Sequence, residues 1–280
     1  MLLSDVTFAE FYKDGFFGYG EKGNFQTFSF FHFLPIILLI AAIILTYIFK
    51  DKIRSFKHEP KIRFFLGIFL LIIEMSYYWR VLYVGAEGND ANLLTKLPFQ
   101  VCEWTCIFAA LMLLTENKHL FDIDVIVCLT IGIFPLFMPV VISKTGPLYY
   151  RYYQFWFEHI GPIYAVFYMM FIKGYKYSFK NVYKALIFLA SLSVISLILN
   201  NNIEGATYLY LTQGSIGNGF EKILPNNQYL RLLVFGIIII FIFIIEWGVF
   251  YLVDRKKNKV VNTELVQWNK MVDEKNLHVY

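Results

Sequence analysis

A thiol and an imidazole stand in two separate apolar segments of this sequence, each beside carboxylate and amide side chains. Cys102 is flanked by Gln100 and Glu103, and His159 directly follows Glu158. A cysteine reacts as its thiolate, and a neighbouring imidazole is a common base that removes the thiol proton. If the two segments pack against each other, Cys102 can act as a nucleophile with His159 as its base.

Further polar side chains lie in the apolar segments, where they are costly. An ionisable group near the centre of a bilayer costs about 2.5–3.5 kcal/mol on insertion scales, so several at one depth indicate a shared internal cavity. We expect this cavity to bind substrate through seven residues: His32, Arg80, Gln100, Glu103, Gln154, Glu158 and Asn201. Arg80 is expected to pair with Glu103 or Glu158, or to hold a phosphate or carboxylate headgroup. The alternative is a structural role for these groups, with Cys102 as a packing residue.

Other catalytic signatures are missing from the sequence. It contains no G-x-S-x-G, P-loop or H-E-x-x-H motif, and no Cys/His set with the spacing of a structural zinc site. Cys106 and Cys128 lack polar neighbours and are interpreted as packing residues. His119 and Asp124 show the H-x4-D spacing of soluble-domain glycerolipid acyltransferases, but without the surrounding domain, so we discount them. We therefore expect no metal ion and no soluble cofactor.

The composition is typical of an integral membrane protein. Of 280 residues, 58% are hydrophobic and only 16% are charged, which exceeds the usual apolar fraction and falls below the usual charged fraction. Seven apolar runs are long enough to be helices in a bilayer. They cover residues 28–49, 63–85, 97–115, 122–143, 150–173, 183–202 and 229–253. The predicted fold class is all-α: a polytopic membrane protein built as a bundle of seven transmembrane helices.

Basic residues are distributed unevenly between the two sides of this predicted bundle. One set of loops and the C-terminal segment carry 17 Lys and Arg, and the other set carries seven. The positive-inside bias therefore places the N-terminus outside and the C-terminus in the cytoplasm of a cell membrane. Most of the candidate site then lies in the outer half of the bilayer. Because the basic residues adjoin membrane spans, the net charge of +4 indicates lipid headgroups and not nucleic acid as a partner.

Three regions follow from this organisation. Residues 1–27 form an extracytoplasmic N-terminal segment, residues 28–253 the transmembrane domain, and residues 254–280 a cytoplasmic amphipathic helix on the inner membrane surface. Residues 203–228 form a long connection that could cover the site as a lid or stay a mobile loop. Pro135, Pro139 and Pro162 allow local breaks or kinks in the fourth and fifth spans.

Two stretches resemble a known family. Residues 97–102 read Leu-Pro-Phe-Gln-Val-Cys and resemble the LP-x-H-x-C pattern in the third helix of the YwaF family of bacterial membrane proteins. Residues 151–159 contain the Q-F-x3-H pattern of that family, and His32 and residues 208–211 fit it as well. The resemblance covers approximately residues 28–250. It implies a bacterial source, which a composition rich in Phe, Ile, Lys, Asn and Tyr also suits.

The YwaF family is similar to eukaryotic polytopic acyltransferases that remodel phospholipids. The resemblance implies that Cys102 accepts an acyl chain as a thioester, that His159 is its base, and that membrane phospholipids and lyso-lipids are donor and acceptor. Gln100 stands where the family pattern often has His, which implies altered acid-base chemistry or a member that binds lipid without turnover. The alternative function is a transporter or solute-binding membrane component with an outer polar pocket. The sequence does not indicate an oligomeric state.

Overall fold

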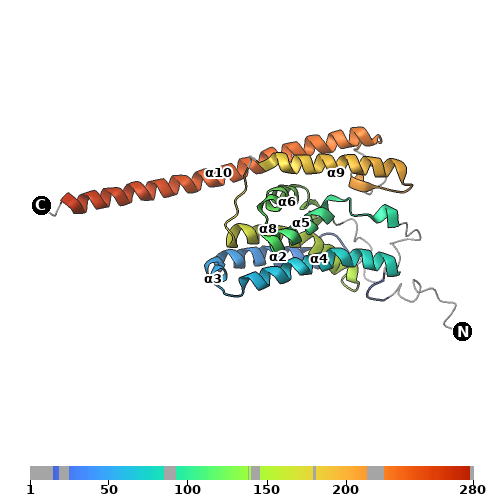
Figure 1. Cartoon of the computed structure of the whole chain (residues 1–280), viewed down its shortest axis with the longest axis horizontal. Helices are drawn as coiled ribbons and strands as arrows, with labels where there is room; N and C mark the ends of the chain where they lie inside the picture. The colour runs from blue at the N-terminus through green and yellow to red at the C-terminus, as the bar shows by residue number, and fades with distance from the viewer. Residues whose placement is uncertain are drawn as a thin grey trace. The chain divides into compact units, whose positions relative to one another are not determined.

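The computed structural model describes residues 15–18, 25–84, 93–137, 139, 146–178, 181–212 and 224–277. Throughout these ranges the regular structure is helical, and no strand occurs in them (Figure 1). The described helices, in chain order, are α2 (Phe30–Ile48), α3 (Lys50–Arg54), α4 (Glu59–Val84), the 3-10 helix η1 (Leu93–Lys96), α5 (Val101–Thr115), α6 (Lys118–Thr130), α7 (Phe134–Phe137), α8 (Tyr150–Ile172), α9 (Val182–Asn202), the 3-10 helix η4 (Tyr208–Tyr210) and α10 (Gln228–Leu277).

Six helical segments in the described part of the chain are long and apolar enough to cross a membrane. They are Phe30–Ile48, Glu59–Leu82, Lys118–Phe137, Tyr150–Ile172, Val182–Asn202 and Gln228–Val253. The predicted third span corresponds to the shorter apolar helix α5 of 15 residues. At 1.5 Å per residue α5 is about 22 Å long, less than the thickness of a bilayer core. The all-α polytopic membrane fold is confirmed, with six helices of spanning length and one shorter apolar helix.

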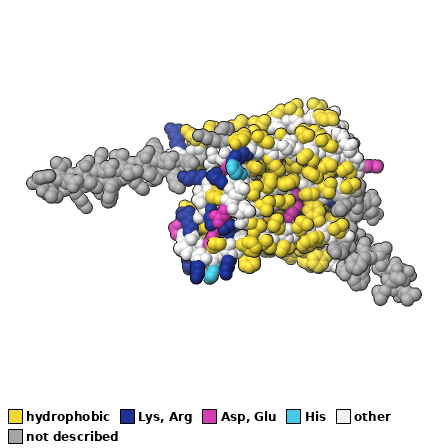
Figure 2. All heavy atoms as spheres, in the orientation of Figure 1, with side chains coloured by type: hydrophobic (Ala, Val, Ile, Leu, Met, Phe, Trp, Pro, Cys, Tyr) yellow, Lys and Arg dark blue, Asp and Glu magenta, His cyan; other side chains and the backbone are white. Residues whose placement is uncertain are grey.

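The outer faces of the helices are apolar. Ile37 of α2, Phe65 of α4 and Ile187 of α9 are 58%, 68% and 61% exposed. Hydrophobic side chains cover a broad area of the face in Figure 2, and charged side chains gather at one end of it, beside α3. A water-soluble protein rarely exposes so large an apolar area. These faces suit contact with lipid chains, as expected of a multi-pass membrane protein.

Helices α4, α5 and α8 pack against one another at the centre of the bundle, α2 lies on α8, and α6 lies between α5, α8 and α9. Glycines allow α4 to approach both of its neighbours closely. A Cβ atom at Gly67 of α4 would lie 2.8 Å from Leu114 Cγ and 3.0 Å from the carbonyl oxygen of Ala110 in α5. A Cβ atom at Gly161 of α8 would lie 2.4 Å from Leu70 Cδ2 in α4. Small residues at such crossings are a general device of helix packing in membranes.

Enlarging Gly67 should therefore destabilise the bundle. We expect Gly67→Val to lower the free energy of unfolding by about 1–3 kcal/mol, because overpacking a tight contact forces backbone shifts. The measurement is denaturant unfolding of the purified protein in detergent. Gly248→Val in α10 is the control, since a Cβ atom at Gly248 meets nothing within 4 Å. Equal effects of the two substitutions would contradict the expected tight α4–α5 contact.

The fourth predicted span is interrupted, as its prolines allow. α6 ends at Thr130, residues 131–133 form turns, and α7 follows with Pro135 as its second residue. Proline is tolerated in the first turn of a helix because the N–H it lacks has no intrahelical partner there. Pro139 lies beyond α7 in non-helical backbone. Pro162, in contrast, lies inside α8, which continues as one helix through it.

Residues 1–236 and residues 237–280 form two separate compact units. In the second unit α10 continues without a break to Leu277. The predicted boundary between transmembrane domain and tail at residue 254 therefore falls inside a continuous helix. A position of this tail on the inner membrane surface stays a prediction. Of the predicted N-terminal segment, residues 1–14 and 19–24 lie outside the described residues.

Candidate functional site

The contact between α5 and α8 brings Cys102, Glu158 and His159 together. A ligand-capable atom of each residue, namely Cys102 Sγ, a Glu158 carboxylate oxygen and a His159 ring nitrogen, lies within 4.8 Å of the other two. Glu158 and His159 are buried and Cys102 is half-buried. The thiol and the imidazole that the sequence assigns to separate segments thus face each other.

Cys102 occupies the second position of α5. The helix begins after Gln100, whose extended backbone (φ −86°, ψ 151°) serves as the N-cap. The Gln100 N–H donates to Glu103 Oε2 at 2.8 Å, which is one half of a capping box. The first N–H groups of a helix have no carbonyl partner within it and carry a partial positive charge. The start of α5 therefore offsets part of the cost of a negative charge on the Cys102 sulfur.

The backbone of α8 determines which nitrogen of His159 carries the proton. Nδ1 lies 2.7 Å from the carbonyl oxygen of Phe155, one turn earlier in the helix. A carbonyl oxygen only accepts, so Nδ1 donates and the neutral ring keeps its lone pair on Nε2. The ring also packs on Phe155, with centroids 4.3 Å apart. These contacts hold the neutral ring of His159 in one tautomer.

Glu158 belongs to a polar stripe along α8. Its Oε2 atom accepts from Gln154 Nε2 at 2.8 Å and from Arg151 Nη1 at 3.5 Å. Arg151 also donates to Gln154 Oε1, and its guanidinium lies 5.0 Å from the centre of the Tyr77 ring of α4. The predicted substrate-binding set contains Gln154 and Glu158 but not Arg151. Arg151 lies three residues before Gln154 and seven before Glu158 in the sequence. This spacing places it on the same helical face as those two residues.

A third carboxylate joins this cluster from α4. Glu74 is 3% exposed, and neither of its carboxylate oxygens has a hydrogen-bond partner among the described residues. Glu74 interacts electrostatically with Glu158, Glu103 and Arg151. The sequence shows that Glu74 is an ionisable residue within an apolar run. It does not show which neighbouring helix Glu74 faces. These residues are referred to below as the Cys102 cluster, which consists of Glu74 of α4, Cys102 and Glu103 of α5, and Arg151, Gln154, Glu158 and His159 of α8.

Comparison with known proteins assigns the chain to a family. The model of the TMEM164 family matches residues 27–247. The chain belongs to the TMEM164 family. No curated protein and no solved structure matches it. The matched range includes the whole Cys102 cluster, and the resemblance to the YwaF family stays a prediction.

In this TMEM164 family member, Arg80 contacts backbone carbonyls of the N-terminal segment, and its role in holding a headgroup stays a prediction. Its Nε donates to the carbonyl oxygen of Phe17, and its Nη2 donates to that of Gly18, both at 3.1 Å. The ion pair of Glu158 is formed with Arg151 and not with Arg80. An arginine side chain is long enough to reach acceptors on several neighbouring segments. The predicted depth of Arg80 in the membrane therefore did not identify its partner. Arg80 ties the N-terminal segment to α4.

His32 uses both ring nitrogens for backbone contacts. Nδ1 accepts from the Phe28 N–H at 2.9 Å, and Nε2 donates to the carbonyl oxygen of Leu136 at 2.7 Å. The ring is 1% exposed and stacks on Phe33, with centroids 5.2 Å apart and planes 7° apart. These contacts join α2 to α7. They support the structural alternative for His32 over the expected substrate contact.

Gln100 and Asn200 hold the segment that follows α9. Gln100 Oε1 accepts from the Leu209 N–H at 3.0 Å, and its Nε2 donates to the carbonyl oxygen of Thr207 at 3.4 Å. Asn200 Oδ1 accepts from the Tyr208 N–H at 2.8 Å, and its Nδ2 donates to the Tyr208 carbonyl oxygen at 3.0 Å. The beginning of the predicted lid is therefore fastened to the start of α5. Residues 213–223 of that connection lie outside the described residues.

This fastened segment places Tyr210 beside the Cys102 cluster. Leu209 and Tyr210 both have φ of +54°, a conformation that non-glycine residues rarely adopt. Although 37% of Tyr210 is exposed, its hydroxyl end is buried, and burial raises the pKa of that hydroxyl. The Cys102 sulfur and the Glu103 carboxylate raise the pKa of Tyr210 further. Strained backbone next to reactive groups is typical of functional sites.

Asn201 points to another part of the surface. Its Oδ1 accepts from Gln228 Nε2 at 2.7 Å. It also lines an open hollow of about 550 Å³ formed by residues 200–207 and Thr212. The lining of this hollow includes none of Cys102, Glu158 and His159. The structure therefore does not bring Asn201 together with the expected catalytic pair.

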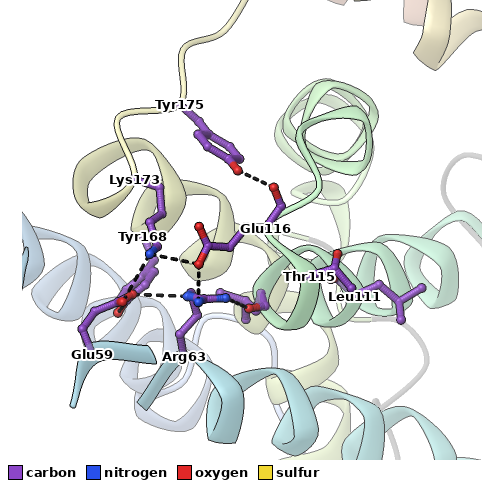
Figure 3. Close-up of polar contacts among 9 residues, drawn as sticks. Glu59, Arg63, Leu111, Thr115, Glu116, Tyr168, Lys173 and Tyr175 are labelled. Carbon is purple, nitrogen blue, oxygen red and sulfur yellow. Dashed lines mark hydrogen bonds and ion pairs between the residues drawn. The ribbon is translucent and has the colours of Figure 1, made fainter. Parts of the chain in front are cut away.

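An ion-pair network, which was not predicted, joins the start of α4 to the ends of α5 and α8, away from the Cys102 cluster (Figure 3). Arg63 Nε pairs with Glu59 Oε1 at 3.3 Å, and the Arg63 guanidinium also pairs with Glu116. Lys173 Nζ lies 3.3 Å from Glu59 Oε2 and 3.1 Å from Glu116 Oε1. Tyr168 donates to Glu59 at 3.0 Å. This network fixes the ends of the helices that carry the Cys102 cluster.

Proposed function

We propose that this chain is an acyltransferase of membrane phospholipids that carries the acyl chain on Cys102. The observation that supports the proposal is the approach of Cys102 Sγ to the His159 ring within 4.8 Å, in a half-buried position between two helices. A base with its lone pair on Nε2 and a sulfur at a helix start are the two groups that thioester chemistry requires. The apolar outer faces of the helices suit a substrate that arrives from the lipid phase.

In the first half-reaction, His159 Nε2 removes the Cys102 proton and the thiolate attacks the carbonyl carbon of a donor acyl ester. The tetrahedral oxyanion faces the first-turn N–H groups of α5, which lack carbonyl partners within the helix. When the C–O bond breaks, the departing lyso-lipid oxygen takes the proton from His159. The products are a Cys102 thioester and a lyso-lipid. Glu158, whose carboxylate lies near the ring, offsets the transient positive charge on the imidazole.

In the second half-reaction, His159 removes the proton of an acceptor lyso-lipid hydroxyl. The resulting oxygen attacks the thioester carbonyl, the C–S bond breaks, and the Cys102 sulfur takes back the proton from His159. Gln154 and Arg151 act through Glu158, since both donate to its Oε2 atom. Gln100, at the position where the family pattern often has His, is engaged with the backbone of Thr207 and Leu209. In this proposal it positions the segment that bears Tyr210.

The test is trapping of the acyl chain. Purified protein in nanodiscs that contain a fluorescent-acyl phospholipid and a lyso-lipid should form a hydroxylamine-sensitive adduct at Cys102, located by peptide mapping. We expect Cys102→Ala to reduce transfer by at least about 10²-fold, because the covalent route is lost. Cys106→Ala is the control, since Cys106 is 0% exposed. Undiminished transfer in Cys102→Ala would refute the proposed function.

The buried carboxylates favour a second candidate, a transporter or solute-binding membrane protein. Glu74, Glu103 and Glu158 lie within one helical bundle and interact electrostatically, as ionisable groups on transport pathways do. This function requires the carboxylates and not the sulfur. Retained ligand uptake in Cys102→Ser, together with its loss in Glu74→Gln, would favour the transporter over the acyltransferase.

A further inference from the structure

We propose that Cys102, Glu158 and His159 bind a divalent cation of the zinc type, which competes with acylation for the same sulfur. Cation binding itself requires only the geometry of the three side chains, whereas the competition rests on the proposed function. The spacing of these residues in the sequence matches no zinc motif, because Cys102 lies more than fifty residues before the adjacent Glu158 and His159. Only the packing of α5 on α8 brings them together.

The donor atoms are those that zinc prefers. A thiolate, an imidazole nitrogen and a carboxylate oxygen bind zinc at about 2.3, 2.0–2.1 and 2.0–2.2 Å, so their atoms lie about 3.4–3.6 Å apart in a tetrahedral site. In the structure the three atoms lie within 4.8 Å of one another. The atoms would have to approach one another by up to about 1.4 Å to reach the distances of a tetrahedral zinc site. Three protein ligands also leave a fourth position for water, the pattern of an accessible zinc site.

The surroundings hold the ligands as metal sites commonly do. A zinc-binding histidine usually donates its second ring nitrogen to a carbonyl or carboxylate, which fixes the tautomer. His159 Nδ1 makes this contact with Phe155, which leaves Nε2 for a cation. Both hydrogen bonds to the Glu158 carboxylate go to Oε2. Its Oε1 atom therefore remains as a ligand atom.

The charge balance of the cluster also favours a cation. The Cys102 sulfur interacts electrostatically with Glu158, Glu103 and Glu74. Glu74 is almost completely buried, and among the described residues neither of its oxygens accepts a hydrogen bond. Arg151 also interacts with Glu74. Several acidic groups buried close together are electrostatically costly, and a divalent cation offsets that cost.

Binding of the cation has a consequence for the proposed chemistry. The sulfur lone pair that would attack an ester carbonyl is shared with the metal, and Nε2 of His159 no longer accepts a proton. A zinc-bound protein should therefore be unable to form the Cys102 thioester. A chelator should restore acylation, because no covalent bond is made or broken when the cation leaves.

Cobalt(II) is a suitable probe, because its bond to a thiolate gives a charge-transfer absorption band. The purified full chain in detergent is first treated with chelator and then titrated with Co²⁺. We expect one equivalent bound with a thiolate band, and displacement of Co²⁺ by Zn²⁺. Cys102→Ser should abolish the band. Glu158→Gln, which keeps the side-chain shape, should weaken binding by about tenfold or more, as the loss of a ligand does in other metal sites.

Cys106→Ser and Cys128→Ser are the matched controls, since both sulfurs are buried and lie outside the proposed donor set. Both controls should keep the band, and unfolding midpoints should show that each variant folds. A band that survives Cys102→Ser, or wild-type protein that binds no Co²⁺, would overturn the proposal. Acyl transfer by chelated protein is measured separately. Transfer without Co²⁺ binding refutes the cation site alone, and Co²⁺ binding without transfer refutes the acyltransferase alone.

Discussion

His159→Gln is expected to reduce the rate of acyl transfer by at least about 10²-fold, the usual contribution of a general base. Glutamine occupies a similar volume and keeps polar atoms beside the Phe155 carbonyl, but it cannot accept a proton from Cys102 in the transition state. Because the imidazole acts in chemical steps, kcat should decrease and KM should change little. The measurement is transfer of a fluorescent acyl chain to a lyso-lipid in nanodiscs.

His119→Gln is the matched control for this prediction. His119 is exposed at the beginning of α6, and its Nδ1 lies 3.1 Å from Lys184 Nζ. The structure places it outside the Cys102 cluster, and its H-x4-D match to soluble acyltransferases is discounted. We expect transfer by His119→Gln to stay within about twofold of the wild type, as for surface substitutions away from a site. If His159→Gln retained wild-type kcat, His159 would not be the base.

Arg63→Met is expected to lower the free energy of unfolding by about 1–3 kcal/mol, because it removes the charge-assisted hydrogen bonds of the guanidinium to Glu59 and Glu116. The side chains of Arg63 and Glu59 are only 8% and 7% exposed, so solvent screens this pair weakly. Methionine fills similar space but leaves Glu59 and Glu116 with Lys173 as their shared cation. The measurement is denaturant unfolding in detergent, with helix content followed by circular dichroism.

Lys61→Met separates this effect from a general loss of positive charge. Lys61 lies two residues before Arg63 in α4 and is exposed. Its substitution should change the free energy of unfolding by less than about 0.5 kcal/mol. A change below about 1 kcal/mol for Arg63→Met would instead mean that the network behaves like a screened surface ion pair.

Helix α8 connects the two regions that these predictions address. Its first half carries Arg151, Gln154, Glu158 and His159, and its last turns carry Tyr168 and lead to Lys173. The ion-pair network therefore restrains the helix that presents the base to Cys102. Because the network and the cluster lie on different turns, the stability and activity effects should be separable. Arg63→Met should leave the rate per folded molecule nearly unchanged.

Much of the architecture follows from the sequence alone. Long apolar runs require helices, because a chain in lipid must satisfy its backbone hydrogen bonds internally. Hydropathy therefore identified the six spanning segments and the shorter helix α5 of the described residues, and the all-α membrane fold. The spacing of Arg151, Gln154 and Glu158 in the sequence also predicts that they share one face of their helix. The functional prediction that Cys102 and His159 form a pair depended on residue chemistry, and the structure brings these two residues together.

Only the tertiary structure determined the lengths and boundaries of the helices and the partners of their polar side chains. It shortened the third segment to α5, interrupted the fourth after Thr130, and continued α10 through the predicted boundary at residue 254. It also directed Arg80 to the N-terminal carbonyls and linked Arg63 to Glu116. The physical reason is that hydropathy and helical period report the environment that each residue prefers. The identity of a hydrogen-bond or ion-pair partner depends on which helices approach each other, and no local pattern specifies that approach.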